Sequence, residues 1–246
     1  MKIIDKVLEF HRKESSHRVG LAIVKGELTT LSPLLPLLHE AERRKFDDFR
    51  FDRRKISYLL GRVSAKKALS AVAPASNASQ VLIDEGVFQF PVGLYQSGPF
   101  FQFCISHCDD IGMALAYPEA HPVGIDIEHI NAKSLEALEG QFTDKEKQML
   151  KELSLNQLEG LTMLWTAKEA LSKIFRTGMM MDFHLFELGK ITKQDGFYLS
   201  EYKNCGQYKA VSLIYKDYAV TLTVPGRSSF DEQQLVGWFA GVVDGV

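Results

Sequence analysis

The chain of 246 residues repeats itself, and this repeat limits the possible folds more than any other feature. "VGLAIV" at 19–24 resembles "VGIDIE" at 123–128, an offset of 104. "LHEAERRKF" and "QFTDKEKQML" place Glu42 and Glu146 at the same offset, and "SAKKALSAV" matches "TAKEALSKI" at an offset of 102. Three matches in one order, at nearly constant spacing, indicate a duplicated fold.

Each copy is expected to run from a strand to a helix with an acidic first turn, then to a longer helix and to further strands. In the second copy "FTDKE" predicts a helix start, with Thr143 as N-cap and Glu146 at N3 closing a capping box. "LEGLTMLWTAKEALSKIF" has apolar residues at helical spacing. "FYLSEYK", "YKAVSLIY" and "YAVTLTV" alternate and are separated by turn residues, which predicts an antiparallel meander.

These patterns predict the α+β fold class, as a pseudo-twofold duplication of two similar lobes, each a small antiparallel sheet packed with helices. The boundary is expected near Pro118, which gives an N-terminal lobe of residues 1–118 and a C-terminal lobe of residues 119–246.

Composition argues against several classes of partner and site. With 29 basic and 31 acidic residues, no excess charge favours nucleic acid or a membrane surface. The N-terminal apolar run contains charges, and no uncharged stretch reaches the roughly 18 residues of a membrane span, so we expect neither a signal peptide nor a span. Three sparse cysteines indicate a reducing compartment, the cytoplasm. A zinc site from Cys104, His107, Cys108 and Cys205 would match no common ligand spacing.

The stretch "HPVGIDIEHI", residues 121–130, is predicted to be a strand because β-branched residues alternate along it. Asp126 and Glu128 then lie on one face of the strand. Two carboxylates this close repel each other unless a positive group lies between them. A solvated edge strand that carries acids for solubility is the alternative interpretation.

The two copies differ at the acids. Where the second copy has Asp126, Glu128 and Glu169, the first has Ala22, Val24 and Lys67. Charges that serve solubility have little reason to gather in one copy, whereas a single cation site needs one set of ligands.

A helical stripe adds to this predicted site. Trp165, Glu169 and Lys173 follow at i, i+4 and i+8 on the long helix. Two strand carboxylates and one helix carboxylate make a hard oxygen site, suited to magnesium or manganese completed by water and phosphate. Lys173 would balance phosphate charge. The alternative for Glu169 and Lys173 is an ordinary surface ion pair.

"GIDIE", followed about forty residues later by "WTAKEALSK", resembles the paired signature of the phosphopantetheinyl transferases. The length and the internal duplication are similar to the surfactin type, a pseudo-twofold monomer of two similar halves. "RRKISYLLGRVSAKKAL" and "FCISHCDD" extend the resemblance over most of the chain.

This resemblance implies transfer of the 4'-phosphopantetheine arm of coenzyme A to a serine of an acyl- or peptidyl-carrier protein, with release of adenosine 3',5'-bisphosphate. It implies that Asp126, Glu128 and Glu169 hold Mg²⁺ against the pyrophosphate, and that Glu169, or a water beside it, is the base. Lys173 matches the lysine on the coenzyme A phosphates, and Lys168 is a second candidate for phosphate contact.

Further coenzyme A contacts are implied in the first half. Ser106 and His107 resemble a short Ser-His element that approaches the nucleotide, with His107 toward the 3'-phosphate. Lys45 and Arg62 stand at positions that are commonly basic in relatives. The alternatives are a loop histidine with a local hydrogen bond, and a solvated mixed-charge helix for Lys45 and Arg62.

The carrier protein is expected to bind near the cleft at "RTGMMMDFHLF", residues 176–186, where methionines suit adaptable contact. The alternative is a buried turn packed on the sheet. Two other functions compete with transfer: a catalytically silent relative that binds coenzyme A or a carrier protein, and a metal-dependent phosphohydrolase. The sequence shows no clustered set of His and Asp residues for the two-metal site that a phosphohydrolase would use.

Overall fold

The computed structural model describes residues 1–96, 100–132, 139–153 and 155–245, with the side chain of Met179 left out. It divides into two compact units: unit 1 comprises Met1–Pro122 and Ser229–Val246, and unit 2 comprises Val123–Ser228. Both units combine helices with antiparallel sheets, so the predicted α+β class is confirmed.

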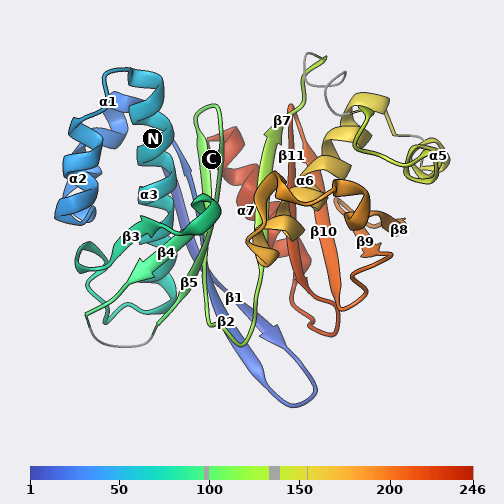
Figure 1. Cartoon of the computed structure of the whole chain (residues 1–246), viewed down its shortest axis with the longest axis horizontal. Helices are drawn as coiled ribbons and strands as arrows, with labels where there is room; N and C mark the ends of the chain where they lie inside the picture. The colour runs from blue at the N-terminus through green and yellow to red at the C-terminus, as the bar shows by residue number, and fades with distance from the viewer. Residues whose placement is uncertain (97–99, 133–138, 154, 246) are drawn as a thin grey trace. The chain divides into compact units, whose positions relative to one another are not determined.

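Unit 1 is built on an antiparallel sheet of four strands in the order β1-β2-β6-β5 (Figure 1). These strands are β1 (Lys2–His11), β2 (Ser16–Lys25), β5 (Gln102–Cys108) and β6 (Ile111–Tyr117). A separate antiparallel pair is formed by β3 (Leu82–Glu85) and β4 (Pro91–Leu94).

The helices of unit 1 are α1 (Leu28–Leu31), α2 (Glu40–Asp47), α3 (Asp52–Val72) and α7 (Glu232–Asp244), and short 3-10 helices span Ser32–Leu37, Ala78–Gln80 and Val87–Gln89. The long helix α3 contacts all four strands of the main sheet (Figure 1). It lies very close to β2, because a Cβ atom on Gly20 would stand 1.9 Å from the carbonyl oxygen of Ala68.

The last helix belongs to unit 1 in space, which differs from the predicted lobe of residues 119–246. Helix α7 buries Leu235, Phe239 and Val242 and packs on β1 and β2. Burial of this apolar stripe explains why the chain returns to the first unit. The sequence repeat predicts a boundary near Pro118, and it does not include α7.

Unit 2 contains one antiparallel sheet of five strands in the order β7-β11-β10-β9-β8. The strands are β7 (Gly124–His129), β8 (Leu188–Lys193), β9 (Tyr198–Tyr202), β10 (Tyr208–Tyr215) and β11 (Tyr218–Pro225). The predicted meander is confirmed, since β9, β10 and β11 pair in sequence with tight connections.

The helices of unit 2 are α5 (Asp144–Glu152) and α6 (Gln157–Phe175), followed by short 3-10 helices at Gly178–Met180 and Phe183–Phe186. Helix α6 packs on β7, β11 and β10 (Figure 1). Thr143 caps α5 and Glu146 closes the capping box, as predicted from the sequence.

The two units repeat one another in detail. Each has a strand, a short helix with a glutamate capping box, and a long helix laid on that strand. The close approach recurs as well: a Cβ atom on Gly124 would stand 2.0 Å from the carbonyl oxygen of Ala170. A side chain at either glycine would push the long helix away from the sheet.

No helix within the described residues is long and apolar enough to cross a membrane.

Candidate active site

Strand β7 and helix α6 bring together four of the predicted site residues inside unit 2. Asp126 and Glu128 lie on β7, opposite Thr221 and Ala219 of β11. Asp126 is only 3% exposed. Because α6 approaches β7 at Gly124, the next turns of that helix lie over the same strand.

Lys173 of α6 reaches back to β7. Its ammonium group donates to Oδ1 of Asp126 at 2.7 Å and to the carbonyl oxygen of Ile125 at 3.1 Å. The lysine side chain is 25% exposed, whereas Asp126 is buried. Lys173 thus pairs with a buried carboxylate of the strand, which the alternative interpretation of a surface pair with Glu169 does not include.

Glu169 and Glu128 both hold their protons more tightly than usual. Burial raises the pKa of Glu128 to about 7, and the charges of Asp126 and Glu169 add to the rise, while Lys173 and a hydrogen bond from Trp165 oppose it. Burial, followed by the charge of Asp126, also raises the pKa of Glu169, against Lys173 and Ser172. The charges of Asp126, Glu128, Glu169 and Lys173 thus act on one another, and the negative charge is incompletely compensated by the lysine.

This donor set fits a hard divalent cation in its chemistry, because it consists of carboxylate oxygens that repel one another. However, within the described part of the chain no group of three or more His, Cys, Asp or Glu side chains is arranged to hold a metal ion. The ammonium group of Lys173 lies on Asp126, where it supplies part of the positive charge. The metal site stays a prediction.

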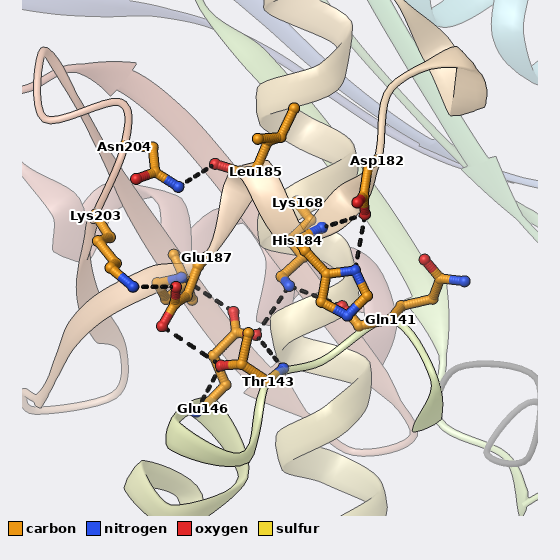
Figure 2. Close-up of polar contacts among 11 residues, drawn as sticks. Gln141, Thr143, Glu146, Lys168, Asp182, His184, Leu185, Glu187, Lys203 and Asn204 are labelled. Atoms are coloured by element: carbon orange, nitrogen blue, oxygen red, sulfur yellow. Dashed lines mark hydrogen bonds and ion pairs between the residues drawn. The ribbon is translucent and has the colours of Figure 1, made fainter.

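Lys168 lies elsewhere in unit 2. It is fully buried, and it donates to Oε2 of Glu146 at 2.9 Å and to the carbonyl oxygen of Gln141 at 2.9 Å (Figure 2). Its ammonium group is buried and cannot reach a phosphate in this position, so Lys168 is not part of the proposed binding site.

In unit 1, Lys45 lies on α2 and Arg62 in the middle of α3. Lys45 forms an ion pair of 2.6 Å with Glu85 at the end of β3, and both side chains are exposed. Arg62 is largely buried, with its guanidinium group 4.9 Å from the ring centre of Tyr58 and Nε 3.8 Å from Glu42. Lys45 can exchange its partner for a phosphate at little cost, whereas Arg62 already has an interior role.

Ser106 and His107 lie on β5 rather than on a loop after it. Ser106 is 8% exposed, and the exposed His107 ring has Nε2 3.0 Å from the hydroxyl of Ser57 on α3. The histidine is therefore a strand residue bonded to a distant helix and not the loop residue with a local hydrogen bond of the alternative interpretation, and its contact with a nucleotide stays a prediction.

The segment at 176–186 divides into exposed and buried parts. Met180 is 74% exposed and Leu185 is 47% exposed, whereas Phe183 and Phe186 are buried in the core of unit 2. Of the three methionines, the side chain of Met179 lies outside the described residues. The buried-turn interpretation therefore applies to Phe183 and Phe186, and the carrier contact of the exposed side chains stays a prediction.

Sequence reasoning did not find the partners of two buried lysines. Glu42 and Glu146 were recognised as matching positions of the repeat, but each also forms a buried ion pair, with Lys66 and Lys168 respectively. The signal was present, because both members of each pair recur at nearly the same offset.

Residues 122–223 match the family model of the 4'-phosphopantetheinyl transferase superfamily. A domain of this superfamily is present. The match runs from the start of β7 into β11, so it contains the four clustered residues of unit 2. The curated proteins include no match to the chain.

Proposed function

We propose that the protein transfers the 4'-phosphopantetheine arm of coenzyme A to a serine hydroxyl of an acyl- or peptidyl-carrier protein, releasing adenosine 3',5'-bisphosphate. One observation carries the proposal. Two acids of β7 and an acid and a lysine of α6 interact within the segment that matches the superfamily, and burial raises the pKa of two of these acids.

Asp126, Glu128 and Glu169 are the proposed ligands of Mg²⁺. When bound, the ion would supply positive charge that neutralises the pyrophosphate of coenzyme A. The carboxylate chemistry and the mutual repulsion of these acids support this assignment.

Glu169 is the proposed base. Its raised pKa makes the carboxylate a better proton acceptor near neutral pH than an exposed glutamate. The hydroxyl proton of the carrier serine passes to Glu169, directly or through a water, as the bond from the serine oxygen to phosphorus forms. The bond from phosphorus to the oxygen of adenosine 3',5'-bisphosphate breaks. Lys173, which is partly exposed, then stabilises phosphate charge.

Lys45, Arg62, Ser106 and His107 are the proposed coenzyme A contacts of unit 1. Lys45 is partly exposed and His107 is exposed, and they carry this proposal better than the largely buried Arg62 and Ser106. We also propose the surfactin type of enzyme, acting as a monomer in the cytoplasm, because one chain contains two similar units. Gel filtration and cell fractionation test these two statements.

Mass spectrometry of an apo carrier protein incubated with coenzyme A and Mg²⁺ tests the proposed function. A gain of the phosphopantetheine mass, lost in Asp126→Ala and kept in Glu201→Gln at an exposed position of β9, supports transfer. Free adenosine bisphosphate with an unmodified carrier would indicate a hydrolase instead. No product from a folded protein that binds coenzyme A would indicate a silent relative.

We propose that the carrier protein contacts Met180 and Leu185, the exposed apolar part of 176–186. Met180→Glu should raise the KM for the carrier and leave the KM for coenzyme A unchanged. Leu94→Glu, at an exposed apolar residue of unit 1, is the control. Equal KM values for the carrier in wild type and Met180→Glu would remove this surface from the proposal.

A further inference from the structure

The described residues contain the same buried ion pair twice. Lys66 lies 3.0 Å from Oε2 of Glu42 in unit 1, and Lys168 lies 2.9 Å from Oε2 of Glu146 in unit 2. All four side chains are at most 1% exposed. Charges buried this completely are retained only when both partners are held in place.

In unit 2 the pair joins four segments of chain. Oε2 of Glu146 also accepts the backbone N–H of Thr143 at 2.9 Å, and Oε1 accepts that of Leu188 at 3.0 Å. Lys168 adds the carbonyl oxygen of Gln141 at 2.9 Å. The pair therefore ties helix α6 to the start of α5, to the turn before it and to the start of β8 (Figure 2).

Unit 1 has the same joint. Oε2 of Glu42 accepts the backbone N–H of His39 at 2.8 Å, and Oε1 accepts that of Ile83 at 2.9 Å. Lys66 also donates to the carbonyl oxygen of Val81. Helix α3 is thus tied to the start of α2 and to β3, as α6 is tied to α5 and β8.

The duplication separates structure from chemistry. In unit 1 the residue after the lysine is Lys67, which pairs with Asp5 at 3.6 Å. In the first copy the buried pair of Lys66 and Glu42 is therefore present although the next residue, Lys67, is not a carboxylate. Because the pair occurs where the acids of the proposed site are absent, we take its role to be structural and not phosphate binding. In unit 2 the residue that follows Lys168 is Glu169 of the proposed site.

We propose that Lys168 is a positioning residue: paired with Glu146, it fixes the rotation of α6 so that Glu169 and Lys173 face Asp126, and it does not touch coenzyme A. Consecutive residues of a helix point about 100° apart, so an anchor at Lys168 sets the direction of Glu169. This inference rests on the proposed function for the roles of Glu169 and Lys173.

The kinetic test uses Lys168→Met, Glu146→Gln and the double variant. Each single change should lower kcat about tenfold or more while the KM for coenzyme A stays within about twofold. The double variant should be no slower than the slower single variant, because both residues act through one joint. A raised KM for coenzyme A with an unchanged kcat in Lys168→Met would mean a direct phosphate contact and would overturn the proposal.

Lys66→Met is the matched control, because it breaks the same joint in unit 1. It should lower the unfolding midpoint as Lys168→Met does, while kcat of the folded fraction stays within about twofold of wild type. If Lys66→Met lowered kcat as much as Lys168→Met, the pair would act only through overall stability. Glu146→Gln keeps one side-chain oxygen that can accept a hydrogen bond, as Oε1 does from Leu188. If Lys168→Met does not fold, the kinetics of Glu146→Gln test the same joint.

Trp165 provides a readout that does not depend on transfer. Its ring centre lies 4.9 Å from that of Phe183, and its side chain lowers the pKa of Glu128 on β7, so rotation of α6 changes its surroundings. The other tryptophan of the chain is Trp238, so a Trp238→Phe background leaves Trp165 as the single indole. In that background, Lys168→Met should change the near-ultraviolet circular dichroism of Trp165. An unchanged spectrum would refute the positioning role, whether or not the wild type transfers phosphopantetheine. Absence of transfer by the wild type would refute the proposed function and would leave this spectral test intact.

Discussion

Replacing Glu128 by glutamine should stabilise the metal-free protein and abolish transfer. The pKa of Glu128 rises from 4.5 in the unfolded chain to about 7 in the folded one, mainly because the side chain is buried. The folded state therefore binds more protons than the unfolded state between these values, and stability falls as pH rises from about 4.5 to about 7. At pH 8 the penalty is at most about 3 kcal/mol, from about 1.4 kcal/mol per pKa unit.

The amide oxygen that Glu128→Gln introduces can still accept from Trp165, so the change removes charge with little loss of packing. Urea unfolding in EDTA at pH 8 should show the variant more stable than wild type by up to about 3 kcal/mol, and at pH 4.5 the difference should nearly vanish. Glu201→Gln, at an exposed position of β9, controls for loss of one negative charge.

Magnesium gives the second half of this test. A ligand that binds only the folded state raises its stability, so Mg²⁺ should stabilise wild type more than Glu128→Gln. If Glu128→Gln were less stable than wild type at pH 8 in EDTA, the repulsion between these acids would not exist as described. Undiminished transfer by the variant would remove Glu128 from the metal ligands.

Three other outcomes are expected. Lys173→Ala should lower kcat, measured by carrier modification, and also the unfolding midpoint, measured by circular dichroism, because it takes the ammonium group away from the buried Asp126 carboxylate; unchanged kinetics would exclude Lys173 from the site. His121 is fully buried and stacks on His17, and burial lowers its pKa to about 4. The free energy of unfolding should therefore fall by about 3 kcal/mol as the pH drops from 6.5 to 4. In urea unfolding His121→Leu should lose this pH dependence, and an equal dependence in the variant would contradict the argument. Gly124→Ala should destabilise the protein by about 1–3 kcal/mol and lower activity, because the added methyl group meets Ala170 of α6, and unchanged thermal unfolding would contradict the close contact.

Patterns of local sequence predicted the elements of unit 2 well. The alternation in 121–130 gave β7, the capping box gave α5, and helical spacing gave α6. These features depend on residues close together in the chain, so their physics can be recognised in the sequence. The boundary between the units and the place of α7 depend on which faces pack together, which no short segment encodes.

The candidate site shows the same division. Spacing alone predicted that Asp126 and Glu128 share one face of a strand and that Glu169 and Lys173 share a stripe of α6. Only the structure placed Lys173 on Asp126 and buried Lys168 against Glu146, because the partner of a long flexible side chain is selected by packing over long sequence distances.

The sequence by itself determined the duplicated elements, the α+β class and the concentration of acids in one copy, because period, capping and composition are local properties. The tertiary structure decided which lysine faces the acids and which is locked in the interior. It also raised the pKa of Glu128 and Glu169, because burial and the approach of charges from separate elements exist only after the chain has folded.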